Sequence, residues 1–467
     1  MKKILFIIYD NGSKNNELPL ATAYLSSVLR NAGYSITLYN SDIYHYSDQH
    51  LTDYLDKNNF DFVMLSFIGG YWQYKQFVRI SNSINKSVNR KNFYYIIGGH
   101  GPSPDPEYFL RKGSVDFIVI GEGERTILEL CSVLGKVGEE YLLQVNGIAY
   151  LKNNRLIMTK PRDLIQDLDS IPFPAWDLFP IEHYVSLSYP NSKRTDRTMS
   201  VLSSRGCIFN CAFCFRIVDG IRFRSPKNVV EEIKLLKEKY GITYIIFADE
   251  LFMGVPKRTK EMCDAFIASD LDIHFSCDGR LNFATPETLK LMKKAGCVYI
   301  TYGIESFDNQ VLKDMNKNLT TDIIDKGLSE TIKAGISPGV NIIFGNIGDN
   351  QKILKKGVDL ILKYTDLSEL RTVRPVTPYP GCELFNRAVR EGKVKDVEDF
   401  YENKHKNSDL LSVNFTDLTD YDFNKALYEA NKTLVNKHFD RQKQAYDNTM
   451  KKIYFEGDDS FRGFRQT

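Results

Sequence analysis

The first third of the chain alternates short apolar runs with amphipathic stretches. The apolar runs predict strands at 3–9, 35–39, 62–67, 94–97 and 115–120, and the stretches between them predict helices at 18–31, 49–55, 73–88 and 124–134. Near-continuous apolar strands separated by helices are typical of a parallel sheet covered on both faces. We therefore predict an α/β, doubly wound, Rossmann-like domain over residues 1–135, with ligands at the carboxyl ends of its strands.

Polar and glycine-rich segments follow these predicted strands. They contain Asn11, then Ser66 and Gly69, then Gly98, Gly99 and His100, and finally Gly121 and Glu122. Glycine allows a backbone to approach a ligand closely. Ordinary turns between strands and helices use glycine as well, so the residues alone leave both interpretations open.

A second alternating pattern begins near residue 198. Six predicted strands, at 198–203, 244–247, 274–276, 298–302, 340–344 and 370–373, are separated by helices, two of which start with the cap-proline pairs Ser225-Pro226 and Thr285-Pro286. Six such units predict a partial (β/α)6 TIM barrel over residues 198–381. Residues 136–197 read as a connector with a hairpin around Asn153-Asn154, and 382–467 as a mostly helical cap and tail, with helices at 384–390 and 421–438.

Three cysteines directly follow the first predicted strand of this barrel. Cys207, Cys211 and Cys214 have the spacing C-x3-C-x2-C. Three thiolates can hold a cube-shaped iron–sulfur cluster and leave one iron open for a small molecule. The alternative is a structural zinc site, which normally needs four ligands, often in two closely spaced pairs. The next cysteines, Cys263, Cys277 and Cys297, are each isolated, which favours the cluster.

Composition narrows the class of protein further. The 467 residues are 43% hydrophobic and 26% charged, with a net charge of +2, which is ordinary for a globular protein and does not favour nucleic acid as a partner. No apolar run approaches the roughly 18 residues of a membrane span. Eight cysteines, three of them clustered, argue against a disulfide framework and predict a cytoplasmic protein.

The cysteine segment resembles the signature of the radical S-adenosylmethionine (SAM) superfamily. The stretch Leu18-Pro-Leu-Ala-Thr-Ala-Tyr-Leu25, the strand ends at Ser66 and 98–101, and residues 115–124 resemble the cobalamin (B12)-binding domain that precedes the radical SAM core in one large subfamily. The resemblance implies a [4Fe-4S] cluster, SAM and cobalamin as cofactors. It assigns these residues to cobalamin: Asn11, Leu20, Ser66, Gly69, Gly98, Gly99, His100, Gly121 and Glu122. The Asp-x-His-x-x-Gly motif of the other branch is absent, so the resemblance implies cobalamin without a histidine ligand.

Residues at the ends of the barrel strands are the candidates for SAM. The segment Gly303-Ile-Glu305-Ser306 matches a motif that lies against SAM in related enzymes, and Phe213 matches an aromatic residue near adenine. Asp249 or Glu250 stands where the family often meets the methionine amino group, although the usual Gly-Gly-Glu reads Ala-Asp-Glu here. Arg280 and Gly345 follow two further strands and complete the set. No residue is assigned a catalytic role.

The resemblance implies an enzyme that reductively cleaves SAM to a 5′-deoxyadenosyl radical. With methylcobalamin opposite, it would methylate an unactivated carbon or phosphorus of a small-molecule, lipid or peptide substrate, with a flavodoxin or ferredoxin as electron donor. A rearrangement, cyclisation or ring contraction without methyl transfer is the first alternative. A radical SAM enzyme without bound cobalamin is the second, and a sensor or scaffold that does not turn over is the third.

Overall fold

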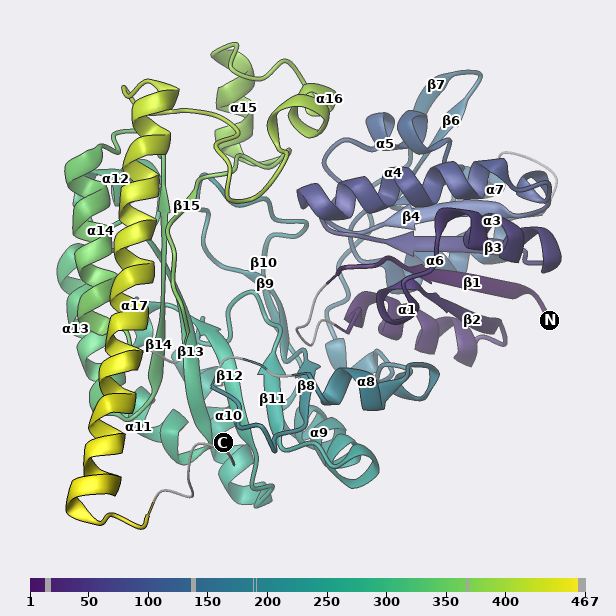
Figure 1. Ribbon diagram of the computed structural model, residues 1–467. Helices are drawn as coiled ribbons and strands as arrows, with labels where there is room; N and C mark the ends of the chain where they lie inside the picture. The colour runs from purple at the N-terminus through teal and green to yellow at the C-terminus, as the bar shows by residue number, and fades with distance from the viewer. Residues whose placement is uncertain (13–17, 136–139, 188, 190, 367–368, 461–467) are drawn as a thin grey trace.

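The computed structural model describes residues 1–12, 18–135, 140–187, 189, 191–366 and 369–460. Two α/β units lie side by side, and the last part of the chain returns to both of them (Figure 1). The end of the predicted tail, beyond residue 460, lies outside the described residues. Within the described ranges, no helix combines the length and the apolar character that a membrane span requires.

The N-terminal unit contains a seven-stranded sheet with the order β2-β1-β3-β4-β5-β6-β7, whose first five strands are parallel. This confirms the predicted doubly wound fold. Its strands are β1 (Lys3–Ile8), β2 (Ser35–Asn40), β3 (Phe62–Ser66), β4 (Tyr94–Gly98), β5 (Phe117–Val119), β6 (Ile148–Lys152) and β7 (Arg155–Met158).

Helices cover both faces of this sheet because successive strand residues point to opposite sides. On β1, Leu5 and Ile7 pack with the side of α3, α4 and α5, whereas Ile4 and Phe6 pack with α1 and α6. The helices are α1 (Leu20–Asn31), α2 (Ser41–Tyr44), α3 (Asp48–Lys57), α4 (Tyr71–Lys86), η1 (Arg90–Asn92), α5 (Pro106–Gly113), α6 (Gly123–Val133) and α7 (Glu140–Leu143).

The hairpin predicted in the connector is present and extends the first sheet. Strand β6 pairs antiparallel with β5, and β7 pairs antiparallel with β6. The sheet therefore continues past residue 135. The chain then crosses to the second unit through η2 (Leu168–Ser170), η3 (Trp176–Leu178) and α8 (Ile181–Val185).

The second unit is a curled parallel sheet of six strands in the order β15-β14-β13-β12-β11-β8, with a separate two-stranded sheet of β9 and β10. It is the predicted partial barrel. Its strands are β8 (Thr198–Val201), β9 (Ser204–Cys207), β10 (Gly220–Phe223), β11 (Tyr244–Phe247), β12 (His274–Gly279), β13 (Cys297–Glu305), β14 (Ser337–Phe344) and β15 (Arg374–Pro375). The prediction of a last strand at 370–373 is wrong, because only Arg374 and Pro375 pair with β14, and proline lacks the amide that would extend an inner strand.

Helices cover the convex face of this sheet, and their starts follow the predicted caps. The Ser225 side chain accepts the Asn228 amide before Pro226, and Thr285 accepts the Thr288 amide before Pro286. The helices are α9 (Pro226–Tyr240), α10 (Pro256–Ser269), η4 (Leu281–Phe283), α11 (Pro286–Lys294), α12 (Asn309–Asp314), α13 (Thr321–Lys333) and α14 (Gln351–Tyr364).

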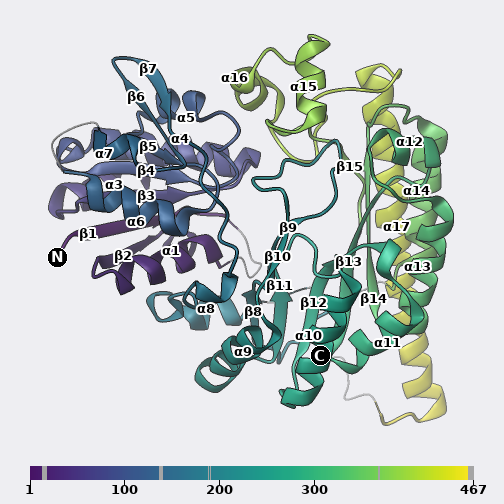
Figure 2. The same ribbon diagram turned by 180° about the vertical axis from the view of Figure 1, so that it is seen from behind.

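The C-terminal region makes contact with both units. Helices α15 (Glu383–Arg390) and α16 (Val397–Asp399) and the π-helix η5 (Phe400–Lys404) share a hydrophobic core with the N-terminal sheet, at one end of the gap between the units (Figure 2). Helix α17 (Asp420–Glu456) begins where a helix was predicted but continues well past residue 438, packed along α14. The prediction of a mostly helical region holds.

Candidate cofactor site

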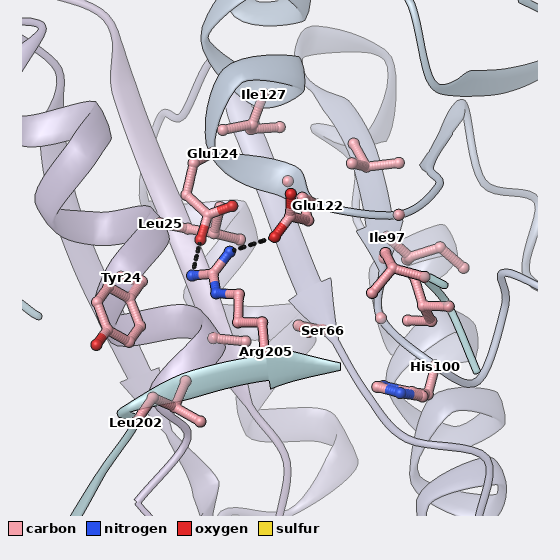
Figure 3. Close-up of a pocket in the computed structure, with 18 of the residues that line it drawn as sticks. Tyr24, Leu25, Ser66, Ile97, His100, Glu122, Glu124, Ile127, Leu202 and Arg205 are labelled. Atoms are coloured by element: carbon pink, nitrogen blue, oxygen red, sulfur yellow. Dashed lines mark hydrogen bonds and ion pairs between the residues drawn. The ribbon is translucent and has the colours of Figure 1, made fainter. Parts of the chain in front are cut away.

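A cavity of ≈ 330 Å³ lies between the carboxyl ends of the two parallel sheets. The N-terminal unit contributes the ends of β3, β4 and β5 to its wall, and the barrel unit contributes Leu202, Arg205 and Ala248. Figure 3 shows side chains from both units pointing into the same space. Most of the wall is apolar, as in sites that take a large organic ligand.

Six of the residues predicted to bind cobalamin line this cavity: Ser66, Gly98, Gly99, His100, Gly121 and Glu122. Asn11, Leu20 and Gly69 do not. The side chain of Asn11 accepts a hydrogen bond from Gln73, and Leu20 packs against the core of the barrel unit. The carbonyl of Gly69 accepts the hydroxyl of Tyr401, so this glycine serves a contact with the C-terminal region.

The glycines in the wall fit a ligand that lies against the backbone. Gly99 has φ +102°, and a Cβ there would lie 2.5 Å from the carbonyl oxygen of Phe67. Gly121 has φ +80°, and nothing stands within 4 Å of the place a Cβ would take. Both positions favour glycine, and the second leaves open space on the cavity side, which is the shape that a corrin ring needs.

His100 lies in the wall opposite the cluster loop, where burial lowers its pKa below the ordinary histidine value. Its ring meets Phe215 of the barrel unit edge-on, with centroids 6.3 Å apart. A neutral imidazole in this position can accept or donate a hydrogen bond to a ligand.

Cys207 is the last residue of β9, and Cys211 and Cys214 lie on the loop that follows it, which is held by backbone contacts from two other segments. The amide of Ala212 donates to Met315, and the amide of Leu384 donates to Ala212. Cys207 and Cys211 are half-buried and Cys214 is exposed. The guanidinium of Arg280 lies 3.9 Å from the sulfur of Cys211 and 3.4 Å from the centre of the Phe209 ring. A cation beside the thiols favours their ionised form, which is the form that ligates iron.

Among the described residues, no three histidine, cysteine, aspartate or glutamate side chains lie close enough together to bind one metal ion. A cubane cluster places each thiolate on a different iron, so its ligands are spread apart, whereas zinc draws its ligands onto one centre. The ligand count still favours the cluster, because three cysteines are one ligand short of a structural zinc site.

The predicted SAM residues occupy neighbouring strand ends around the cysteine loop. Glu305, at the end of β13, accepts a hydrogen bond of 3.0 Å from Lys317 and has φ +72°, a backbone conformation that is rare for glutamate. Phe213 packs in both hydrophobic cores, and the Lys317 ammonium lies 5.5 Å from its ring centre. The amide of Gly345, at the end of β14, donates to Asp349.

Three buried polar atoms at these strand ends have no hydrogen-bond partner within the described part of the chain. They are Nη2 of Arg280, Oγ of Ser306 and Oδ1 of Asn346, which follow β12, β13 and β14. Buried polar atoms are normally paired, so this edge is where a polar ligand such as SAM would complete the bonding.

The acidic pair after β11 is divided between two roles. Asp249 is fully buried and accepts the Ser203 amide at 2.6 Å, the Ser203 hydroxyl and the Ser204 amide. Its carboxylate therefore anchors the segment before the cysteine loop. Glu250 lines the cavity, and the partial loss of solvent around its carboxylate raises its pKa above the ordinary glutamate value. Of the two predicted SAM contacts, Glu250 is the one whose carboxylate is available.

Glu122 lines the cavity, and it is also held by other residues of the protein. Burial alone would raise the pKa of Glu122, but hydrogen bonds from Arg222, the Ile165 amide and Arg205 outweigh it and leave the pKa below the ordinary glutamate value. Its carboxylate is thus engaged by the protein.

Sequence reasoning missed Arg205 and Lys317, the partners of these acids, and Asp278, whose pKa burial raises to about 6 on the open face of β12. Arg205 stands two residues before the cysteine motif, and Glu122 follows Gly121 in the glycine-rich segment. Their opposite charges were the available signal, but no spacing rule pairs residues 83 positions apart.

Two family models match the chain. The Radical SAM superfamily model matches residues 201–361, and the B12 binding domain model matches residues 11–131. The first covers β8 to α14, and the second covers the parallel part of the N-terminal sheet after β1.

Individual proteins extend the likeness over both units. An uncharacterized methyltransferase of Pyrococcus horikoshii is 30% identical over 342 residues, which are 70% of this chain and 72% of the relative. The anaerobic magnesium-protoporphyrin IX monomethyl ester cyclase of Rubrivivax gelatinosus is 25% identical over 417 residues, 85% of this chain and 72% of that protein. The structure of TsrM from Kitasatospora setae, a radical SAM methyltransferase with cobalamin and a [4Fe-4S] cluster bound, aligns with a TM-score of 0.66 and 15% identity over 84% of this chain and 75% of that one. The last comparison concerns the fold.

Proposed function

This chain belongs to the radical SAM superfamily in the branch that carries a B12-binding domain, and we propose that it is a cobalamin-dependent methyltransferase. When bound, the cluster supplies the electron that cleaves SAM, and cobalamin supplies the methyl group. We propose residues 1–135 as the cobalamin-binding unit, 136–197 as the connector, 198–381 as the radical SAM core and 382–467 as the C-terminal cap.

The observation that carries the proposal is the shared cavity. The cobalamin-facing glycines Gly98 and Gly121 and the barrel residues Leu202 and Glu250 line one space, and that space ends at β9, the strand that leads into Cys207. A ligand held on the N-terminal sheet would therefore lie against β9, the strand that ends at Cys207. In this proposal Glu305 and Glu250 orient SAM through their carboxylates, and Arg280 stabilises the thiolates.

The C-terminal region closes one end of the gap and limits the entry of water. Tyr401 stacks on Tyr74 of α4 with ring centroids 4.5 Å apart, and Leu384 binds the cysteine loop through its amide. Exclusion of water protects reactive species in such sites. We further propose a cytoplasmic enzyme that receives electrons from a flavodoxin or ferredoxin and acts on a small molecule, lipid or peptide.

The test needs no knowledge of the substrate. Protein reconstituted without oxygen, with its cluster and reduced cobalamin, is mixed with SAM labelled at its methyl group. The proposal expects labelled methylcobalamin to form, and a product heavier by one labelled CH2 when a metabolite extract is added. Protein that binds cobalt and cleaves SAM but moves no label would overturn the methyltransferase assignment.

The second candidate is a cyclase or rearrangement enzyme that uses both cofactors without methyl transfer. The likeness to the Rubrivivax gelatinosus cyclase over 85% of this chain favours it. Its signature in the same experiment is a new product of unchanged methyl content together with 5′-deoxyadenosine.

A further inference from the structure

We propose that Glu122, Glu124, Arg205 and Arg222 form a charged clamp that sets the position of the cobalamin cavity relative to the cluster, with Arg205 as the positioning residue. The inference rests on the proposed function only in that both cofactors bind. Figure 3 shows Arg205 between the two carboxylates, with one ion pair to each.

The clamp joins one pair of acids to one pair of cations across the two units. The acids flank Gly123 at the start of α6, on the cobalamin side. The cations are cross-strand neighbours, because Arg222 of β10 pairs with Arg205 of β9. Arg205 lies 3.0 Å from Glu122 and 2.5 Å from Glu124, and Arg222 lies 2.9 Å from Glu122.

Ile165 of the connector also forms hydrogen bonds with two of the clamp residues. The amide of Ile165 donates to Glu122 at 2.8 Å, and Arg222 donates to the carbonyl of Ile165 at 2.6 Å. The Arg205 guanidinium also lies over the ring of Tyr24, 5.6 Å from its centre, so α1 contributes as well. Few other arrangements of the two units would satisfy all of these bonds at once.

Because the clamp residues are largely buried, their ion pairs restrict how the two units can be placed relative to each other. The side chains of Glu122, Glu124 and Arg222 are at most 9% exposed, and that of Arg205 is 18% exposed. Two positive and two negative charges cancel, but any one of them left alone would stand in a poorly hydrated wall. Exposed ion pairs contribute little, whereas a buried charge that loses its partner is strongly unfavourable. The two units therefore cannot shift relative to each other without breaking bonds that water does not replace.

The clamp lies on a short path between the two cofactor sites. Gly121 lines the cobalamin cavity immediately before Glu122, and Arg205 precedes Cys207 by two residues on the same strand. Gly206, which lines the cavity, directly precedes the first predicted cluster ligand, Cys207. A side chain that fixes this path acts on the distance and angle between the cofactors, and it touches no reacting atom.

The second contact between the units makes the idea testable. The C-terminal region holds the N-terminal sheet independently, through Tyr401 on Tyr74 and on the Gly69 carbonyl. Loss of the clamp should therefore leave the units associated but less well aligned. A purely structural role would lower stability without changing the relation between the cofactors.

The experiment uses the full chain with its cluster and added cobalamin. We compare Arg205→Met, Arg205→Lys and the charge-swapped pair Arg205→Glu with Glu124→Arg. The matched control is Arg111→Met with Glu107→Gln, an exposed ion pair within α5. The readouts are the dissociation constant for cobalamin, the electron spin coupling between the reduced cluster and cob(II)alamin, and the rate of methyl transfer from labelled SAM to cobalamin.

We expect Arg205→Met to weaken or broaden the spin coupling and to slow methyl transfer about tenfold, since one broken buried contact is worth about that factor. In Arg205→Lys the spin coupling and the rate of methyl transfer should lie between those of Arg205→Met and wild type. The swapped pair should recover part of the spin coupling. The control should match wild type in all three readouts. Unchanged spin coupling in folded Arg205→Met protein would overturn the proposal.

Two further outcomes are decisive. If Arg205→Met does not fold, Arg205→Lys and the swapped pair take its place, and wild-type spin coupling in both overturns the clamp. If wild-type protein binds cobalamin but forms no methylcobalamin, the methyltransferase proposal fails. The spin coupling then still decides the role of the clamp, because it needs both cofactors and no methyl transfer.

Discussion

The two parallel sheets turn their carboxyl ends toward the same cavity, yet the residues that follow their strands differ in kind. The N-terminal sheet ends in small residues, with Ser66, Gly98 and Gly121 in the wall. The barrel sheet ends in ionisable groups, with Glu250 after β11, Arg280 after β12 and Glu305 at the end of β13. Apart from His100 and the clamp acids Glu122 and Glu124, the N-terminal side offers small residues and backbone, whereas the barrel side offers charged groups beside the predicted cluster ligands. The same sheet architecture thus serves two kinds of binding, and the difference lies entirely in the residues that follow the strands.

Removal of one cluster thiol should abolish cluster binding in the barrel unit and leave cobalamin binding by the N-terminal unit intact. For Cys211→Ala we expect iron to fall from about four per chain to near zero, because a cubane with two protein ligands is not retained. SAM cleavage should be lost, while bound cobalamin stays close to the wild-type level. Iron and cobalt analysis with an absorption spectrum measures this. Cys131→Ala, which removes a buried thiol from the N-terminal core, is the control. Normal iron in Cys211→Ala would show that this cysteine is not a ligand.

Loss of a carboxylate at the end of a barrel strand should weaken SAM binding without disturbing the backbone there. Glu305 has φ +72°, so Glu305→Gly keeps a conformation that glycine adopts freely and removes only the group that faces Lys317. We expect SAM to bind roughly tenfold to a hundredfold more weakly, as for a lost charge-assisted hydrogen bond. Calorimetry of SAM binding to the unreduced holoenzyme measures this.

The control for this change is Asn153→Gly, at an exposed turn residue with φ +46°. It makes the same kind of backbone substitution on the hairpin, away from the barrel. SAM affinity in Glu305→Gly equal to that of the control would remove Glu305 from the SAM site.

Adding a single methyl group should disturb the glycine-rich cavity wall at the ends of the N-terminal strands. In Gly99→Ala the new Cβ would lie 2.5 Å from the Phe67 carbonyl oxygen at φ +102°, so the end of β4 must shift. We expect a loss of roughly 1–3 kcal/mol in the free energy of unfolding and weaker cobalamin binding. SAM binding should change little.

Gly33→Ala is the matched control, since Gly33 has φ +89° but no atom within 4 Å of the added Cβ. It carries the same backbone strain at an exposed turn outside the cavity. Cobalamin affinity that falls equally in both variants would indicate a general loss of stability and not a shaped wall.

The comparison also explains how far the sequence could predict the molecule. Both folds could be predicted from apolar periodicity, and Cys207, Cys211 and Cys214 could be recognised as one ligand set because they lie within eight residues. The short helix α5 was missed because eight residues carry little periodicity, although Asp105 and Pro106 mark its start.

Which residue of a strand end faces the cavity is harder to predict. Asp249 and Glu250 are adjacent, and one residue along an extended chain reverses the side chain's direction. The buried carboxylate of Asp249 therefore anchors Ser203, while Glu250 lines the cavity. Likewise Glu122 lies where a ligand contact was predicted, but its partner Arg205 belongs to a distant segment that only the folded chain brings near.

The smallest expected effect concerns pH and a carboxyl group behind the β14 strand end. Burial raises the pKa of Asp349 to about 6, outweighing the hydrogen bonds from Asn346 and Gly345. Between about pH 4 and pH 6 the native state holds a proton that the unfolded chain has released, so stability falls as the pH rises through this window, by up to about 1.4 kcal/mol per pH unit. Above pH 6 both states are ionised and the dependence ends. Asp349→Asn should lack this slope in urea unfolding of the cluster-free chain, and SAM cleavage at neutral pH should change less than in any variant above. Parallel stability curves for Asp349→Asn and wild type from pH 4 to 6 would mean that folding does not raise the pKa of this buried acid.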